Sequence, residues 1–417
     1  MDVGTSAVRI CAWDPLADIS VMAHADLAPA QREGTHSEQD PNDWWRALCT
    51  AMDDLFVRIP GARIAGISLD STSSTLLPID SSGIPLAPAR MYDDARAIDA
   101  AKQVEAVAPQ DSGAHGVTSS LSKWLHWQAE NSLPKNARLL HATDWLLGQL
   151  CGMYETTDEN NALKLGYDPV QRVWPSWIER LEIDRTTLPR VVAPGTPLGV
   201  LRSELCQRWN IAQHTPVFAG TTDSTAAFLA SGASQPGDAL TVLGSTLVVK
   251  VLSTQPVFAP EYGVYSHRLH DLWLVGGASN SGGAVLRQHF SDAEIRTLTP
   301  ALNPAQTTGL NYYPLPKPGE RFPHNDPALQ PRLTPQPEDR AQFLQGIFEG
   351  IAQIEAEAYA RLAELGANPV QRIFSSGGGA QNAAWTTIRQ RLLNKPMLPA
   401  RRREAACGVA RLATAQA

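Results

Sequence analysis

The sequence predicts an α/β fold divided into two domains of similar design. Its 417 residues exceed the length of one typical domain. Strand-like and helix-like stretches alternate along the first half, and the second half repeats that order. A short turn of glycine and hydroxyl residues also occurs once in each half. We place the boundary near residues 226–240 and expect an N-terminal domain over 1–228 and a C-terminal domain over 229–417.

Composition and charge indicate a globular protein with a real core. Hydrophobic residues make up 43% of the chain and charged residues 18%, with a formal net charge of −7. Because no basic stripe is present, we expect no nucleic-acid partner. No apolar run reaches membrane-spanning length and no signal peptide precedes the first motif, so we expect a cytoplasmic protein with no membrane association. The five scattered cysteines indicate neither a disulfide framework nor a zinc site, and we expect reduced thiols.

The two glycine turns each predict a β-hairpin. Residues 2–6 run into the β-branched stretch 7–10, and residues 241–246 run into the stretch 247–250. Glycine allows the backbone to approach a ligand closely, and the neighbouring amides and hydroxyls can bind phosphate oxygens. The pair of turns therefore suggests a duplicated domain that holds phosphates in a central cleft. The alternative is two unrelated hairpins, since a short glycine motif has many false positives.

In the first half, apolar spacing predicts a helix over 42–57, capped by Asn42 or Asp43. Residues 65–69 predict a short strand that ends at Asp70, and helices are expected over 120–130 and 139–151. The segment 165–200 is rich in proline, tryptophan and turn residues and is expected to be irregular.

In the second half, residues 221–233 predict a helix of small residues and 272–277 a strand ending in glycine. The proline-rich segment 300–342 is expected to be loop. The clearest helix covers 343–365, with one apolar stripe and Gly366 to end it. A strand over 372–375 then runs into Gly377-Gly378-Gly379 and a helix from about Asn382 to Leu393. That order is typical of a nucleotide bound at a helix N-terminus.

Taken in order along the chain, these motifs resemble the FGGY carbohydrate kinases, which have two ribonuclease-H-like domains of the actin and hexokinase type. The stretches that carry the resemblance are Asp2–Ser6, Tyr92–Arg96, Gly220–Asp223, Gly244–Thr246, Gly377–Asn382 and Glu404–Gly408. Within the family, residues 158–168 and the Asp70-Ser71 pair are similar to the plant and cyanobacterial kinases that act on D-ribulose.

The sequence departs from the family pattern at its start. The family has an apolar strand before the first aspartate, but only Met1 precedes Asp2 here. A central strand would lose its first half and leave its neighbours partly unpaired. We therefore hypothesise that the chain starts too late or is truncated, which an upstream extension of the chain would test.

The resemblance implies roles for three residues in phosphoryl transfer. Asp223 would be the base that accepts the proton of the sugar hydroxyl, although an aspartate before Ser-Thr is also a common helix cap. Asp2 would be the carboxylate that holds Mg²⁺, mainly through water. Thr5 would act with the neighbouring Gly4 amide and Ser6 to hold the γ-phosphate. No G-x-x-x-x-G-K-[ST] motif is present, so the chain is not a P-loop enzyme.

Binding roles follow from the same resemblance. Asp70, Ser71, Asp94 and Arg96 would bind the sugar together with Asp223, because carboxylates accept hydroxyl hydrogen bonds well. An internal ion pair between Arg96 and Asp93 is the alternative for those two residues. The residues implied in ATP binding are Gly4, Thr5, Ser6, Gly244, Ser245, Thr246, Gly377, Gly378, Gly379 and Asn382. For these the alternative is ordinary turn chemistry.

The function implied is an ATP- and Mg²⁺-dependent kinase that phosphorylates the terminal hydroxyl of a pentulose, with D-ribulose ahead of D-xylulose. A catalytically impaired sugar or nucleotide sensor on the same fold is an alternative from another class. An actin-like structural ATPase is a third alternative, but it would not need the residues that the resemblance implies in sugar binding. The expected partners are the small-molecule sugar and ATP, and the sequence leaves open whether the protein is a monomer or a homodimer.

Overall fold

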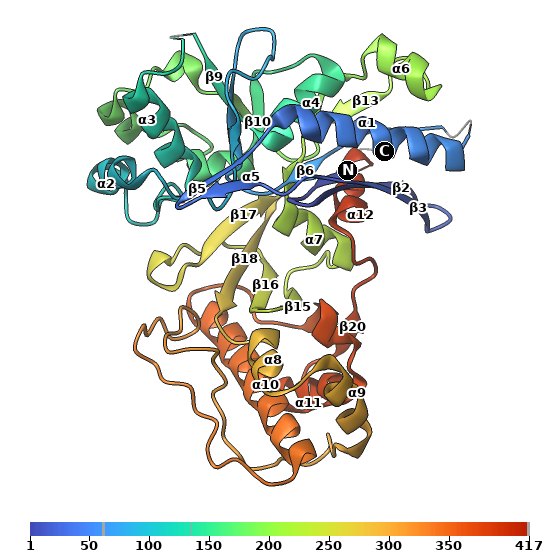
Figure 1. Ribbon diagram of the computed structural model, residues 1–417, viewed down its shortest axis with the longest axis vertical. Helices are drawn as coiled ribbons and strands as arrows, with labels where there is room; N and C mark the ends of the chain where they lie inside the picture. The colour runs from blue at the N-terminus through green and yellow to red at the C-terminus, as the bar shows by residue number, and fades with distance from the viewer. Residues whose placement is uncertain (61–62, 135, 415–417) are drawn as a thin grey trace. The chain divides into compact units, whose positions relative to one another are not determined.

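The computed structural model describes residues 1–60, 63–134 and 136–414, and the chain divides into two compact units (Figure 1). Unit 1 contains Met1–Ala230, His267–His270 and the described residues that follow Arg403. Unit 2 contains Ser231–Ser266 and Asp271–Arg403. The chain therefore leaves unit 1 after Ala230 and returns to it twice.

Unit 1 is built on two five-stranded sheets. The first has the spatial order β14 (Thr221–Thr222), β6 (Asp70–Ser71), β1 (Asp2–Val3), β2 (Ala7–Asp14) and β3 (Ile19–Asp26). The second has the order β4 (Gln31–Glu33), β5 (His36–Gln39), β8 (Ala89–Arg90), β7 (Leu76–Ile79) and β9 (Arg138–His141). Two small ladders pair β10 (Thr156–Asp158) with β11 (Arg190–Val192) and β12 (Pro197–Val200) with β13 (Pro216–Phe218).

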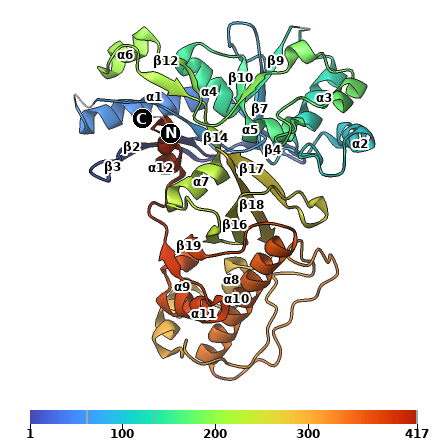
Figure 2. The ribbon, with the colours of Figure 1, turned by 180° about the vertical axis from the view of Figure 1, so that it is seen from behind.

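The helices of unit 1 cover these sheets. They are α1 (Pro41–Arg58), α2 (Ile98–Val107), α3 (Ser120–Glu130), α4 (Ala142–Cys151), α5 (Glu159–Ala162), α6 (Ser203–Trp209), α7 (Asp223–Ser231) and α12 (Ala405–Val409). Short 3₁₀ helices lie at Leu163–Leu165, Ser176–Leu181, Arg185–Thr187 and Ala410–Ala413. Figure 1 shows α1 on one face of the β2–β3 hairpin and α12 on the other. In the rear view, α12 again lies beside α7 (Figure 2).

The core of unit 1 packs against the first sheet. Val8 and Ile10 point inward from β2, because alternate residues of a strand share a face. They belong to one buried cluster with Trp44 and Leu48 of α1 and Trp145 of α4. The strands that carry the predicted site residues thus rest on a closely packed core.

Unit 2 is built on one mixed sheet. Its order is β17 (Tyr265–Leu269), β18 (Leu272–Ser279), β16 (Leu247–Ser253), β15 (Asp238–Leu243), β19 (Arg372–Ser376) and β20 (Met397–Pro399). From His267 onward, β17 belongs to unit 1. Its α-helices are α8 (Gly283–His289), α9 (Asp292–Leu298), α10 (Arg340–Glu364) and α11 (Ala383–Leu393). Short 3₁₀ helices lie at Pro260–Tyr262, Thr299–Ala301 and Gly378–Gln381. The buried stripe of α10, including Ile347, Ile351 and Ile354, packs in the core of this unit.

Both predicted hairpins are confirmed. β1 and β2 pair antiparallel around the turn at Gly4–Ser6, and β15 and β16 pair antiparallel around Gly244–Thr246. The predicted helices at 120–130 and 343–365 correspond to α3 and α10, and Gly366 follows α10 with a φ of +106°. A strand followed by a glycine turn and a helix is also present, as β19 and α11.

Three local predictions were wrong. The cap of α1 is Asp40, whose side chain accepts from the amide of Asn42, because Pro41 already occupies the first helical turn. The predicted helix over 139–151 begins as strand β9, since Leu139 and Leu140 pair with β7. The predicted strand 65–69 makes a single bridge at Ile67, and regular pairing begins only at Asp70.

Candidate functional site

Three carboxylates gather at one end of the first sheet of unit 1. Strands β14, β6 and β1 run parallel, and their register places Asp70 beside Asp2 on one side and Thr221 on the other. Asp223 follows shortly after Thr221 and is the first residue of α7. The charges of Asp2 and Asp223 both act on Asp70. The fold therefore assembles residues that lie far apart in the sequence.

Burial disfavours the charged forms of two of these carboxyls, Asp70 and Asp2. Asp70 is 0% exposed, and neither of its carboxyl oxygens meets a hydrogen-bond donor. Burial, and next the charge of Asp2, raise the pKa of Asp70 well above its ordinary value. Burial also raises the pKa of Asp2, although the Arg9 guanidinium opposes it. The ionised form of Asp70 is therefore disfavoured beside the Asp2 carboxylate.

The first predicted phosphate-binding turn, Gly4–Ser6, is held by hydrogen bonds to its backbone. The amide of Gly4 donates to the carbonyl oxygen of Ala7 at 3.1 Å. The side-chain amide of Gln39 donates to the carbonyl oxygen of Thr5, also at 3.1 Å. Thr5 is half-buried and Ser6 is exposed, so the turn is both held in place and open to a ligand.

Arg9 belongs to this site and was missed in the sequence. It lies opposite Asp2 in the ladder of β1 and β2, with its Nη1 3.5 Å from Oδ2 of Asp2. Its Nε is 3.8 Å from Oε2 of Glu404, and its side chain is 38% exposed. A partly exposed guanidinium beside the turn supplies positive charge where phosphate oxygens are expected. The sequence did contain a signal for this contact, because a hairpin that turns at Gly4–Ser6 places residue 9 opposite residue 2.

The sugar-side residues lie in unit 1 but differ in their partners. Ser71 is buried, and its hydroxyl lies 2.7 Å from that of Thr143 at the start of α4. Asp94 is also buried, and it accepts from the amide of Ser37 at 2.8 Å and from the guanidinium of Arg96 at 2.6 Å. A direct contact between these side chains and a sugar remains a prediction.

Arg96 forms an internal ion pair, but its partner is Asp94 and not the expected Asp93. Arg96 also pairs with Glu38 at 2.7 Å, while the neighbouring Asp93 pairs with Arg32 at 2.7 Å. Burial alone would raise the pKa of Asp94, but its bonds to Arg96 and the Ser37 amide outweigh burial and lower it. Asp94 is therefore held as a carboxylate that fixes the Tyr92–Arg96 turn.

The second phosphate turn lies in unit 2 and is braced by α8. The amide of Gly283 donates to the carbonyl oxygen of Gly244 at 2.8 Å, and the amide of Ala284 donates to that of Ser245 at 3.0 Å. Arg287, on the same helix, donates from Nη2 to the Ser245 hydroxyl at 2.7 Å. Arg287 is exposed and was missed in the sequence, where nothing marks it as a neighbour of this turn.

The third glycine turn joins β19 to α11 in unit 2. Gly377 has a φ of +84°, and a Cβ there would lie 2.6 Å from the carbonyl oxygen of Leu243. Only glycine fits so close to the neighbouring strand. Asn382 caps α11 by accepting from the amide of Trp385 at 3.0 Å, and its own amide donates to Thr299 at 2.9 Å. Both the oxygen and the nitrogen of this side-chain amide already have hydrogen-bond partners within the chain. A contact from Asn382 to adenosine remains a prediction.

A buried ion pair links the strands that carry these two turns. Arg389 donates to Glu355 from Nε at 2.6 Å and from Nη2 at 2.7 Å, and both residues are 0% exposed. Glu355 also accepts from the hydroxyl of Thr241 in β15, and Arg389 donates to the hydroxyl of Ser375 in β19. The pair therefore fixes β15 and β19 to α10 and α11.

The carboxylates of Asp2 and Asp70 are compatible with a Mg²⁺ site in which the protein supplies only one or two ligands. Among the residues that the structure describes, no three His, Cys, Asp or Glu side chains are arranged to hold a metal ion. Mg²⁺ commonly keeps several waters and takes one or two carboxylates together with phosphate oxygens. The donors present are oxygens, namely Asp2 and the unpartnered carboxyl of Asp70, and this donor set fits Mg²⁺.

The cysteines differ from expectation. Cys11 in β2 and Cys407 in α12 form a disulfide. Their separation of 396 residues hides the pair in the sequence, because they meet only when the end of the chain packs back on the first hairpin. Cys49, Cys151 and Cys206 are free thiols.

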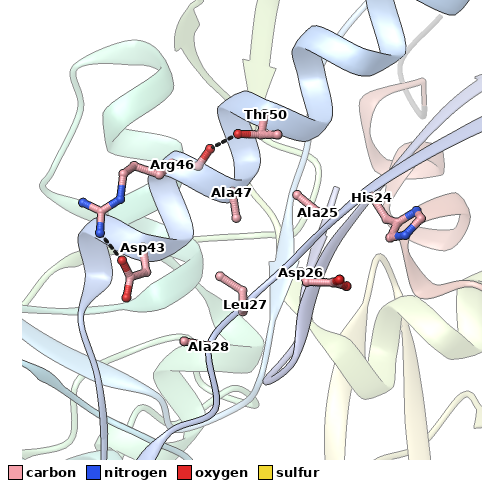
Figure 3. Close-up of a pocket in the computed structure, with 9 residues that line it drawn as sticks. All are labelled: His24, Ala25, Asp26, Leu27, Ala28, Asp43, Arg46, Ala47 and Thr50. Carbon is pink, nitrogen blue, oxygen red and sulfur yellow. Dashed lines mark hydrogen bonds and ion pairs between the residues drawn. The ribbon is translucent and has the colours of Figure 1, made fainter.

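One cavity of unit 1 lies away from the predicted site. It has a volume of about 550 Å³ and lies between β3 and α1 (Figure 3). Its polar lining includes Asp43 and Arg46, which pair with each other on α1. None of the predicted site residues lines it. We therefore assign the cavity no part in the site.

Comparison with known proteins decides the family. The model for the N-terminal domain of the FGGY family of carbohydrate kinases matches residues 1–230, and that for the C-terminal domain matches residues 239–417. The chain belongs to the FGGY family of carbohydrate kinases. The FGGY family consists of phosphotransferases that act on an alcohol group, which agrees with the resemblance seen in the motifs.

Relatives and solved structures agree with this assignment. The chain is 24% identical to the xylulose kinase of Lactococcus lactis, over 95% of this chain and 83% of the relative. It is 26% identical to the xylulose kinase of Streptomyces coelicolor, over 98% and 86%. A xylulose kinase structure from Brucella ovis has a TM-score of 0.88 at 24% identity, covering 100% of this chain and 90% of that one. Plasmodium falciparum glycerol kinase with ADP gives 0.84 at 17%, covering 99% and 87%.

Among the described residues, no helix combines the length and apolar character needed to cross a bilayer.

Proposed function

We propose that the chain transfers the γ-phosphate of ATP to the terminal hydroxyl of a pentulose, with D-ribulose as the preferred substrate. The observation that carries the proposal is the group formed by Asp2, Asp70 and Asp223 at adjacent strand ends. In a carbohydrate kinase, such a group supplies a carboxylate for proton transfer beside one for the metal.

Asp223 is the proposed base. It opens α7 and is half-buried, so its carboxylate is neither sealed in the core nor freely mobile. The amide of Ser224 donates to its Oδ1 at 2.6 Å, which fixes the orientation of the carboxylate. From this position it accepts the proton of the attacking hydroxyl as the bond to phosphorus forms.

The phosphates are held by backbone and cationic groups of the chain. Gly4, Thr5 and Ser6 bind the γ-phosphate in unit 1, where Arg9 adds positive charge. When bound, Mg²⁺ neutralises charge on the phosphates, and Asp2 is the residue that holds it.

The nucleotide contacts lie in unit 2. In this proposal, Gly244, Ser245 and Thr246 bind the inner phosphates through amides and hydroxyls. The remaining nucleotide residues receive the adenosine by close backbone approach, and they are Gly377, Gly378, Gly379 and Asn382.

The choice of D-ribulose rests on the resemblance of residues 158–168 and of Asp70-Ser71 to the ribulose-specific kinases. D-xylulose is the second candidate, because the curated relatives described above are xylulose kinases. The two sugars differ in the configuration of one hydroxyl, which one or two hydrogen bonds can distinguish. Because ATP and sugar are small molecules of the cytoplasm, we also place the enzyme there.

The test is ADP release by the purified protein with ATP and Mg²⁺. The sugars are D-ribulose, D-xylulose, L-ribulose, L-xylulose and glycerol, with a control that lacks sugar. We expect release that depends on sugar and has its highest kcat/KM with D-ribulose. A preference for D-xylulose would correct the substrate, whereas release independent of sugar would contradict kinase activity.

A further inference from the structure

A lysine that the proposed reaction does not use is completely enclosed in unit 1. Lys123 lies on α3 with 0% exposure, and its Nζ donates to the carbonyl oxygens of Ser74 and Met91, both at 2.7 Å. Both of these partners are uncharged, and the nearby Asp94 and Asp93 act on the ammonium through their charge. A lysine is rarely buried without a counter-ion, because removing its charge from water is costly.

The two carbonyl groups belong to the two loops that carry the sugar-side residues. Ser74 follows the Asp70-Ser71 strand and has a left-handed φ of +66°, which is unfavourable for a residue with a Cβ. The bond from Lys123 to its carbonyl stabilises this conformation. Met91 starts the turn that ends at Asp94, whose amide donates to the same Met91 carbonyl at 3.0 Å.

The helix that carries Lys123 is itself fixed. The hydroxyl of Ser119 caps α3 by accepting from the amide of Ser122 at 3.1 Å. The hydroxyl of Ser120 lies 2.9 Å from Nε2 of the buried His141, which in turn contacts Asp144 at 3.2 Å. Lys123 is one turn further along, so its ammonium is held at a defined point between the two loops.

The surroundings of the ammonium favour a role in holding the loops. Burial lowers the pKa of Lys123 to about 7, while Asp94 and Asp93 favour the charged form and Arg90 and Arg96 oppose it. An apolar side chain of the same length would avoid the cost of burying this charge. The charge-assisted bonds to two loop carbonyls are what such a side chain would not provide.

We propose that Lys123 is a positioning residue of the sugar site, which keeps the Ser71–Ser74 and Met91–Asp94 loops in their binding arrangement. This inference rests on the proposed function, because it assumes that these loops bind the sugar. Lys123 acts through Ser74 and Met91 and is not expected to contact the phosphates. Its loss should therefore weaken the use of sugar and leave the use of ATP unchanged.

The test compares K123M with the matched control K102M, which makes the same change at an exposed lysine of α2. For K123M we expect the KM for the preferred pentulose to rise about ten- to a hundredfold, the range for loss of charge-assisted hydrogen bonds. The KM for ATP should stay within about twofold of wild type. Hydrogen exchange should be faster at the amides of residues 72–75 and 91–96.

Other outcomes separate the inference from the proposed function. A K123M sugar KM equal to that of K102M would overturn the inference, and so would a lower thermal stability with an unchanged sugar KM. If K123M does not fold, K123Q, which keeps a donor without the charge, carries the same test on sugar KM. If the wild-type protein itself shows no sugar-dependent turnover, the proposed function fails, and the exchange measurement still decides whether Lys123 orders the two loops.

Discussion

Asp2, Asp70 and Asp223 lie close together but differ in how deeply they are buried. Asp70 is enclosed and its pKa is raised by burial and by Asp2, whereas Asp223 is only half-buried. A carboxylate that a substrate hydroxyl can reach is the one suited to accept its proton. This difference is the physical reason to prefer Asp223 over Asp70 as the base.

Replacing Asp223 tests that preference. We expect D223A to lower kcat by about 10²- to 10⁴-fold, the usual contribution of a general base, and to leave nucleotide binding nearly intact. The measurements are ADP release with the preferred pentulose and calorimetric titration with ATP. The matched control is D99A, which removes an exposed carboxylate of α2 and should keep wild-type turnover. Wild-type turnover in D223A would assign the base elsewhere.

Asp158 predicts a pH dependence of stability. It caps α5 from a buried position, and burial together with the charge of Asp144 raises its pKa to about 7, from 3.8 in the unfolded chain. The folded state therefore binds more protons between these values, so this contribution to stability is full below pH 3.8 and is lost as the pH rises towards 7.

Urea unfolding of wild type and D158N from pH 4.5 to 8 measures this effect. We expect the free energy of unfolding of wild type to fall more steeply with rising pH than that of D158N. Parallel curves for the two proteins would show that Asp158 does not titrate in this range.

At the scale of elements, the sequence predicted what local spacing determines and missed what distant contacts determine. The hairpin turns and α10 follow from residues close together in the chain. The start of α4 was wrong because Leu139 and Leu140 find strand partners in β7 that helical spacing does not reveal. Arg9 and Arg287 were missed for the same reason, since each becomes a site residue only through pairing or packing.

Contact between α12 and α7 positions the helix that begins with Asp223. A Cβ on Gly408 would lie 1.8 Å from the carbonyl oxygen of Ala226, which no side chain can accommodate. We expect G408A to push the helices apart, destabilise unit 1 by about 2 kcal/mol or more and lower kcat. Thermal unfolding and ADP release measure both effects. In the control G199A the new Cβ has no neighbour nearer than 3.6 Å, and near-wild-type behaviour is expected. Equal stability of the two variants would contradict this packing.

In unit 2, the Glu355–Arg389 pair should contribute strongly to stability. Removing one partner leaves an uncompensated buried charge, so E355Q should cost about 3–5 kcal/mol in the free energy of unfolding. The control E364Q breaks an exposed pair with Arg361 and should cost less than about 1 kcal/mol. Chemical denaturation compares the two variants, and equal losses would show that the buried pair is not important.

At the scale of the whole molecule, the sequence predicted a chain of two α/β domains, and the family models cover both parts. What it did not reveal is that residues 267–270 and those after Arg403 return to unit 1. The returning segment brings Glu404 to Arg9 and Cys407 to Cys11. Such long-range pairings have no local signal, which is why the disulfide was not expected.

Each candidate residue lies in a short motif, so the sequence alone could predict it. The structure brings some of these motifs together. Asp2, Asp70 and Asp223 meet in unit 1, whereas the turns at Gly244 and Gly377 lie on neighbouring strands of unit 2. The sequence did not reveal that Asp94 is already engaged by Arg96, since their pairing depends on how the Tyr92–Arg96 turn closes.

Phosphoryl transfer from ATP to a defined sugar hydroxyl can be observed by ³¹P NMR. The sample contains protein, ATP, Mg²⁺ and D-ribulose, and a second sample contains D223A in place of the wild-type protein. We predict a phosphate monoester on the terminal carbon of the sugar, formed in step with ADP by wild type and not by D223A. ADP formed together with inorganic phosphate, with no sugar ester for any pentulose, would contradict phosphoryl transfer to a sugar.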